Sequence, residues 1–436
     1  MHSISLCTSL FALSYFLERE TLFKMMLARA GRSAGVLRRA FATAVDASGV
    51  SVAAVDHGQP TAAVTLLVKA GSRYETQQGA AHLLKNFAFK TTSQRSALRT
   101  AREAEFYGGV LSSTLTREHL AITAEFLRGD EPYFVELLSS VIASPQFLPY
   151  ELTEAVIPST IAESTAALAD PATQALELAH AIAFRSTGLG ASLFAQHPSP
   201  TNLDGVKQFA ASAFTKGNVA VVGTGIDASK LSQLVSKHLA GLPSAGAGTK
   251  SSSSQYFGGE TRVGAHDGNA VFIGFGASAA SHELAVLHSY LDTTPAVKWT
   301  AGSSPLAGTG AIPVYIPYSD AALFGVLVTG NNIAQDTKTA VAALKRGLTK
   351  EDATKAAAKA KFRAASAVEG REGLVNAVAP QVFGGPKASL ESVHAALDKV
   401  SDASVSKTLS SLLGGKPTFV AVGDINGLPY ADELGL

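Results

Sequence analysis

The sequence predicts a mixed α/β fold in which one type of domain occurs twice. Strand-like and helix-like segments alternate along the chain, and a stretch of small and polar residues at 242–259 interrupts this alternation near the middle. Segments before and after this stretch correspond at offsets of about 200 residues, which is too long for a solenoid repeat unit. A chain of 436 residues also divides readily into two domains of ordinary size. We therefore expect two homologous domains that arose by duplication.

Pairs of strand-like segments define this repeat. They are 61–75 with 269–283, 117–126 with 320–330, and 218–226 with 418–425. Their β-branched and apolar residues alternate or form unbroken runs, as in strands, whereas 131–144 and 227–242 show the apolar spacing of helices. The second of these helices is expected to begin after an N-cap at Asp227 and to end at Gly241-Leu242-Pro243.

The amino-terminal segment has the composition of a mitochondrial transit peptide. Residues 26–44 carry four arginines and no acidic residue, with apolar residues at near-helical spacing. Residues 1–25 have a short apolar part without a basic leader, which favours a mis-annotated upstream start and a true initiator at Met25 or Met26. The alternative is a basic surface helix. We predict a transit peptide at 1–41, an N-terminal domain at 46–243, a linker at 244–258 and a C-terminal domain at 259–436.

Composition and charge argue against several classes of function. The chain has 36 basic and 35 acidic residues, and removing the six basic and two acidic residues of 1–41 leaves 30 against 33, which does not suggest a nucleic-acid-binding protein. No run of 18 or more apolar residues predicts a membrane-spanning helix, so we expect membrane association to come through partner proteins. The single cysteine, Cys7, lies in the predicted transit peptide, so the mature chain is expected to have no disulfide or thiolate metal site.

Several common site patterns are incomplete in this sequence. Gly223, Gly225 and Ala228 match the dinucleotide pattern G-x-G-x-x-A, but the acidic residue expected about 20 positions later is missing, so a plain strand-to-helix turn is favoured. The 11 histidines contain no i, i+4 pair, and the closest two, His282 and His288, are expected to be partly exposed on one helix. No G-x-S-x-G pattern indicates a serine hydrolase.

The stretch GAAHLLKNFAFKTT, residues 79–92, resembles the zinc-binding helix of the pitrilysin-type metallopeptidases, family M16. The motif of that family is H-x-x-E-H, with a third ligand, a glutamate, about 76 residues later. In this register His82 and Glu163 keep the outer positions of the motif. Lys85 replaces the catalytic glutamate, and Asn86 replaces the second histidine.

These two replacements remove the chemistry of a zinc peptidase. A catalytic zinc normally has three protein ligands, an open position for water, and a general base beside that water. The ammonium of Lys85 repels a metal ion and accepts no proton, and the amide oxygen of Asn86 is a poor zinc ligand. The sequence therefore predicts a degenerate motif without a catalytic or metal-binding residue, in which His82 is a satisfied core or interdomain residue. The other apolar residues of this stretch, expected to serve mostly in packing, are Leu83, Leu84, Phe87 and Phe89.

Longer stretches are similar to the core protein 2 family of mitochondrial ubiquinol:cytochrome c oxidoreductase, respiratory complex III, a non-peptidase branch of M16. They cover almost the whole chain from about residue 46 and include VKAGSRYE, REHLAITAEFLRGD and YSDAALFGVLVTG. The resemblance implies two α+β domains, each a mostly antiparallel sheet with packed helices. It also implies a structural and assembly subunit that supports electron transfer from ubiquinol to cytochrome c without a cofactor, redox centre or enzymatic activity of its own.

The same resemblance implies partners and a location. The partners are core protein 1 and the cytochrome b, cytochrome c1 and iron–sulfur subunits of a dimeric complex, on the matrix side of the inner mitochondrial membrane. The alternative is the noncatalytic, substrate-recognising α subunit of the mitochondrial processing peptidase, which has a long glycine-rich loop in its second half. The corresponding stretch here, 291–310, has no glycine run and favours the respiratory subunit. Residual binding of a basic presequence near Glu163 is left open.

Overall fold

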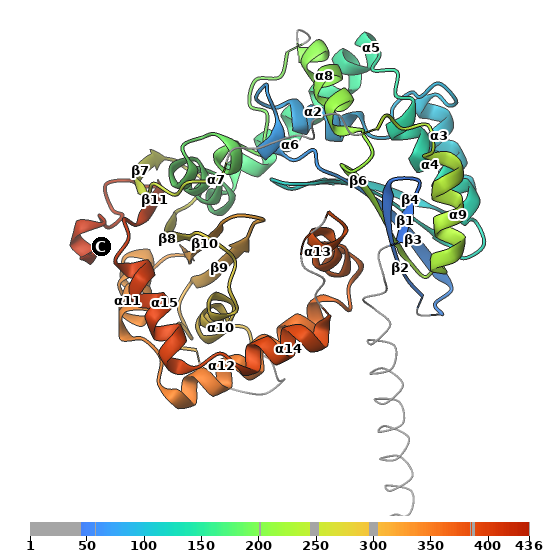
Figure 1. Cartoon of the computed structure of the whole chain (residues 1–436). Helices are drawn as coiled ribbons and strands as arrows, with labels where there is room; N and C mark the ends of the chain where they lie inside the picture. The colour runs from blue at the N-terminus through green and yellow to red at the C-terminus, as the bar shows by residue number, and fades with distance from the viewer. Residues whose placement is uncertain are drawn as a thin grey trace, which may run out of the picture.

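The computed structural model has two halves, each built around one β-sheet with helices packed against it (Figure 1). It describes residues 45–56, 58–199, 202–244, 253–295, 304–383, 385 and 389–435. The predicted transit peptide at 1–41 and residues 245–252 of the predicted linker lie outside the described residues. The predicted fold class, two homologous units with antiparallel-dominated sheets and packed helices, is confirmed.

The N-terminal half contains a six-stranded sheet in which only β2 and β6 are parallel neighbours. Central strands β3 and β6 are buried along almost their whole length, which explains their unbroken apolar sequences. Strand β5 alternates between buried and half-buried residues, because helices cover it on one face. The strand order is β1 (Val45–Ala47), β2 (Val50–Val55), β6 (Val219–Thr224), β3 (Thr61–Val68), β5 (Leu120–Leu127) and β4 (Val110–Leu115).

The C-terminal half repeats this topology with one strand fewer. Its five-stranded order is β7 (Gly259–Gly264), β11 (Thr418–Gly423), β8 (Ala270–Ala277), β10 (Ala322–Thr329) and β9 (Ala311–Pro317). Here β7 and β11 are the parallel pair, and the other neighbours are antiparallel. The segment pairs predicted from the sequence therefore occupy equivalent positions, because β3 matches β8, β5 matches β10, and β6 matches β11.

Several of the helices begin at a residue whose side chain caps the helix. Asp227 accepts hydrogen bonds from the backbone N–H groups of Ser229 and Lys230, so the predicted N-cap of α9 is confirmed. The helices of the N-terminal half are α2 (Ala80–Phe87), α3 (Ala97–Phe106), α4 (Glu131–Ala143), α5 (Pro149–Glu151), α6 (Ile157–Ala169), α7 (Pro171–Phe184), α8 (Leu203–Ala213) and α9 (Ala228–His238). Those of the C-terminal half are α10 (His282–Leu291), α11 (Ile333–Arg346), α12 (Lys350–Ala367), α13 (Arg371–Val382), α14 (Leu390–Asp398) and α15 (Asp402–Leu413).

Two equivalent helices cross between the halves. Helices α7 and α13 start 200 positions apart, at Pro171 and Arg371, and each covers the sheet of the other half. Figure 1 shows α7 beside β11 and β8, and α13 in the space beside β6. The alanine stripe of α7 packs on β8, β10 and β11, and the larger side chains of α13 pack on β2, β3 and β6. The residues are Ala175, Ala179 and Ala183 of α7 and Leu374, Val375 and Val378 of α13.

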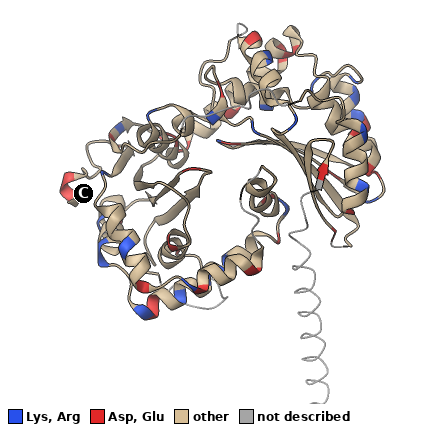
Figure 2. Ribbon diagram, viewed as in Figure 1, with Lys and Arg blue, Asp and Glu red and all other residues tan. Residues whose placement is uncertain are grey.

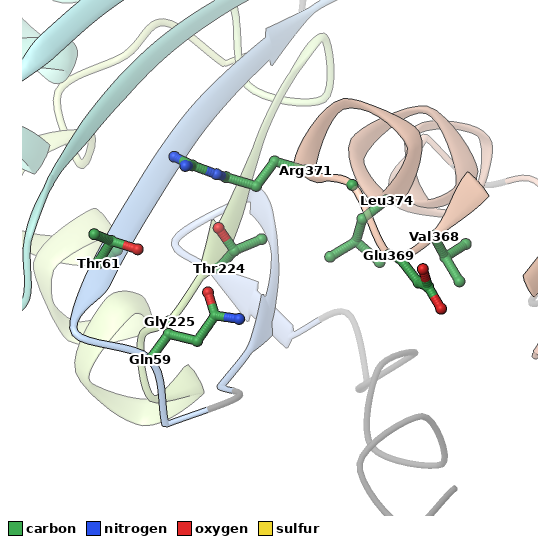
Figure 3. Close-up of a pocket in the computed structure, with 10 residues that line it drawn as sticks. Gln59, Thr61, Thr224, Gly225, Val368, Glu369, Arg371 and Leu374 are labelled. Atoms are coloured by element: carbon green, nitrogen blue, oxygen red, sulfur yellow. The ribbon is translucent and has the colours of Figure 1, made fainter. Parts of the chain in front are cut away.

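The start of α13 is held at the ends of β3 and β6. Arg371 forms an ion pair with Glu125 of β5, and Figure 3 shows Thr61 and Thr224 on the strand side of a small hollow opposite Leu374. This hollow has a volume of about 50 Å³, which is enough for water molecules but not for an organic ligand. It therefore lies at the contact between α13 and the sheet of the N-terminal half.

The reciprocal cover predicts that neither half folds alone. Residues 46–243 without the second half would expose the sheet face that α13 covers, and 259–436 would expose the face that α7 covers. We expect each half to lack a cooperative melting transition by circular dichroism, and co-expression of the two to restore one. A single half that melts cooperatively near the Tm of the full chain would contradict this prediction.

Candidate functional site

The start of α2, the helix with the degenerate motif, is determined by a glycine and a glutamate. Gly79 at the N-cap has a φ of 83°, and a Cβ at this position would lie 2.6 Å from the Cβ of Ala195. Glycine is therefore required both by the left-handed backbone and by the close approach. The Oε2 of Glu75 accepts a hydrogen bond of 3.1 Å from the backbone N–H of Ala81, one of the donors left free at a helix start.

The structure brings the degenerate motif together around one carboxylate oxygen. His82, Lys85 and Asn86 lie on α2, and Glu163 reaches them from α6. The Oε2 of Glu163 lies 2.7 Å from His82 Nε2, 2.5 Å from Lys85 Nζ and 3.3 Å from Asn86 Nδ2. Asn86 Nδ2 also donates to the hydroxyl of Thr160 on α6, at 2.9 Å. Polar contacts therefore connect α2 to α6 at each position of the motif.

Both ring nitrogens of His82 have partners. The Nδ1 accepts a 3.1 Å hydrogen bond from the backbone N–H of Ala195, so the proton of the neutral ring sits on Nε2 and is donated to Glu163. The residue is only 3% exposed and its ring meets Phe194 edge to face, with 5.9 Å between centroids. Burial lowers the pKa of His82. His82 is therefore a neutral, buried histidine whose hydrogen-bonding capacity is used.

Lys85 neutralises Glu163. Burial alone would raise the pKa of Glu163, but the hydrogen bonds from Lys85 and His82 outweigh it and hold the pKa below the ordinary value. Glu163 is therefore ionised at neutral pH, and Lys85 Nζ lies directly on the carboxylate oxygen that the M16 motif assigns to a metal. Within the described residues, no group of three or more His, Cys, Asp or Glu side chains is arranged to hold a metal ion. The residues present do not fit zinc.

A second polar cluster, which sequence reasoning did not single out, joins the two halves. The guanidinium of Arg73 contacts both carboxylate oxygens of Asp320, at 2.7 and 2.6 Å, and Glu118 Oε1 at 2.8 Å. Glu118 in turn accepts hydrogen bonds from the hydroxyl and the backbone N–H of Ser319. Glu118 lies in the β4–β5 turn, and Ser319 and Asp320 lie in the equivalent β9–β10 turn. The sequence pattern that could have identified this cluster is the presence of charged residues in both copies of this turn.

Helix α7 adds further contacts at the same junction. The buried His180 accepts a 2.7 Å hydrogen bond at Nε2 from the hydroxyl of Tyr318, since its Nδ1 donates to the carbonyl of Leu176. Burial lowers the pKa of His180 to about 3, so this ring is neutral. Arg117 forms a buried ion pair with Glu177 of α7, with a distance of 2.5 Å. The His180–Tyr318 hydrogen bond therefore joins the halves, and the Arg117–Glu177 ion pair holds α7 at the β4–β5 turn beside it.

The other residues that the sequence analysis considered as site candidates have structural surroundings in the fold. Gly225 has a φ of 75°, and a Cβ there would lie 2.6 Å from the carbonyl oxygen of Thr61, so the glycine serves the turn between β6 and α9. His282 is exposed at the start of α10 and His288 is half-buried, where burial lowers its pKa to about 4. Figure 2 shows charges of both signs on the outer helix α12, whose acidic residues, Glu351 and Asp352, both lie in its first turn. No described helix is long and apolar enough to cross a membrane.

Comparison with known proteins identifies the family. The family model of insulinase, peptidase family M16, matches residues 51–197. The chain is 45% identical to the mitochondrial cytochrome b-c1 complex subunit 2 of Cryptococcus neoformans, over 93% of this chain and 96% of the relative. The chain belongs to the cytochrome b-c1 complex subunit 2 family. The family members of Yarrowia lipolytica and Homo sapiens are 38% and 27% identical, over 92% and 89% of this chain and 98% and 90% of their own.

The match to the M16 model includes the whole degenerate motif of this subunit 2 family member. Residues His82, Lys85, Asn86 and Glu163 all lie within 51–197. The half that matches the M16 model is therefore retained in sequence and fold. Two positions of its motif are occupied by Lys85 and Asn86.

A double-mutant cycle measures what the ion pair contributes. Lys85→Met and Glu163→Gln, made singly and together, should show a coupling of about 1 kcal/mol in the free energy of unfolding, modest because the side chain of Glu163 is 41% exposed. Because the pKa of Glu163 is lowered, this coupling exists above the ordinary glutamate pKa and is lost as the pH falls through the lowered value. Urea denaturation across the acid range checks both points, with Lys85→Arg as the charge-conserving control. A coupling that persists in strong acid would show that the interaction is not ionic.

The combined variant Lys85→Glu, Asn86→His restores the M16 register, so we expect it to retain about one zinc per chain after dialysis. Elemental analysis measures this. The matched control, Lys85→Glu with Asn86→Ala, lacks the second histidine and should retain no zinc. If the restored variant also binds none, α2 and α6 no longer hold the geometry of a zinc site.

Proposed function

We propose that this chain is a noncatalytic structural subunit of the mitochondrial cytochrome b-c1 complex and an inactive homologue of M16 peptidases. The observation that carries the proposal is the similarity to cytochrome b-c1 complex subunit 2 along nearly the whole chain, at up to 45% identity. The relatives compared above are named for that complex, which favours the respiratory subunit over the processing-peptidase alternative.

The geometry of the degenerate motif supports the noncatalytic part of the proposal. The ammonium of Lys85 lies 2.5 Å from Glu163, where a metal-activated water would require an open coordination position. Asn86 is directed to Thr160 and Glu163 through its amide nitrogen, which is a donor and not a ligand. Two of the three required ligands and the general base are therefore lacking or blocked.

The connection between the halves supports a scaffold role. Moving the two halves apart would break the bidentate contact of Arg73 with Asp320. It would also expose the apolar sheet surfaces on which α7 and α13 pack. A frame that resists such opening is suited to hold neighbouring subunits at fixed positions. The proposed neighbours are core protein 1 and the cytochrome b, cytochrome c1 and iron–sulfur subunits, with this chain on the matrix side of the inner membrane and attached through these partners.

Purification of the tagged chain from mitochondria tests the proposal. We expect cytochrome b and cytochrome c1 to be retained in about equimolar amounts, and depletion of the chain to reduce the assembled complex and ubiquinol:cytochrome c reductase activity in parallel. Lys85→Met should leave the turnover per assembled complex unchanged. Recovery with the processing peptidase and without cytochrome b would make the proposal wrong.

A further inference from the structure

A cavity behind the start of α2 has no role in the functions discussed so far. Its volume is about 440 Å³, within the usual range of small-molecule sites. It lies between the Ser72–Gln78 segment, α7 and the turn that follows α7. Thr76, Gln78 and Thr187 are exposed at its rim, so the cavity is reached from the surface.

The described lining of this cavity is acidic. It contains the carboxylates of Glu75 and Glu177 with several amide and hydroxyl side chains, and no Lys, Arg or His is among the lining residues. Glu177 is already satisfied: Oε1 pairs with Arg117, and Oε2 accepts hydrogen bonds of 3.0 Å from the hydroxyl of Ser192 and from the backbone N–H of Leu193. Its charge is therefore compensated within the protein.

Glu75 differs from Glu177 because it has no ion-pair partner among the residues that the structure describes. Its Oε2 accepts the N–H of Ala81, but its Oε1 is buried and has no hydrogen-bond partner in the described structure. Burial raises the pKa of Glu75 to about 7. A buried carboxylate oxygen without a partner costs free energy, which a positive group in the adjoining cavity would reduce.

We propose that this cavity binds a cationic nitrogen group, an ammonium or a guanidinium, whose charge neutralises Glu75. Gln174 and Gln196 line the same cavity, and an amide side chain has an oxygen that can accept the other N–H groups of the cation. Such a group comes either from a small free cation or from a lysine or arginine of a neighbouring subunit. The site is separate from the Lys85–Glu163 pair, where the carboxylate is already neutralised.

Calorimetric titration of the full chain tests the site directly. The probe is n-butylguanidinium, the neutral control ligand of similar shape is n-butylurea, and the buffer is at about pH 8, where Glu75 is ionised. We expect binding of the guanidinium only, weakened about tenfold or more by Glu75→Gln. The control Glu105→Gln, on the exposed surface of α3, should change the affinity less than about twofold. Ala181→Phe, which fills the cavity from α7 and leaves Glu75 unchanged, should also abolish binding.

Repeating the titration on the native complex identifies the source of the cation. Binding by the complex means that the site accepts a free cation, whereas binding by the isolated chain alone means that a partner's side chain occupies it. Equal binding of n-butylurea, no effect of Glu75→Gln and Ala181→Phe, or no binding by the isolated chain overturns the proposal. The isolated-chain titration does not depend on membership in the complex, so its failure is distinguishable from failure of the proposed function.

Discussion

The structure depends on the exchange of one helix between its two halves. Each central sheet has two apolar faces, and its own half supplies helices for only one of them. The second face is covered by α13 in the N-terminal half and by α7 in the C-terminal half. The two helices occupy equivalent positions in the repeat, so the same element serves each half in the same way. The free energy of burying these faces is available only when the halves are joined, so stability and the relative position of the halves are coupled.

The polar contacts at the junction give this arrangement its specificity. Apolar surfaces tolerate sliding, but Arg73 is 6% exposed and contacts Glu118 and Asp320 in one geometry. A buried guanidinium is costly without partners, so an alternative register of the halves would leave it uncompensated. His180 also favours this one alignment of the halves, because a neutral buried ring with two hydrogen bonds has only one favourable position. The apolar surfaces covered by α7 and α13 supply the affinity between the halves. The charged turn residues define how the two halves align with each other.

The sequence was sufficient for the repeat, its three pairs of strands and the cap at Asp227, because hydrophobic periodicity and local capping are encoded within short segments. The proximity of His82 and Glu163 followed from the spacing of the M16 motif. The exchange of α7 and α13 did not follow, because a periodic pattern identifies a helix but not the sheet on which it packs. The contact of Arg73 with Asp320 spans 247 positions, and the orphan oxygen of Glu75 depends on packing around it. Neither the Arg73–Asp320 contact nor the environment of Glu75 produces a pattern within a short segment of the sequence.

The replacement of a metal site by Lys85 follows from the same electrostatic requirement. Glu163 projects from α6 toward α2 and lies 2.7 Å from the buried His82, so without Lys85 its half-exposed carboxylate would have no ion-pair partner at this contact. The ammonium of Lys85, at the position of the glutamate in the M16 motif, supplies that partner at 2.5 Å and connects the two helices. Asn86 completes it by donating to Thr160 and Glu163. The residues that depart from the M16 motif are therefore also those that connect α2 to α6.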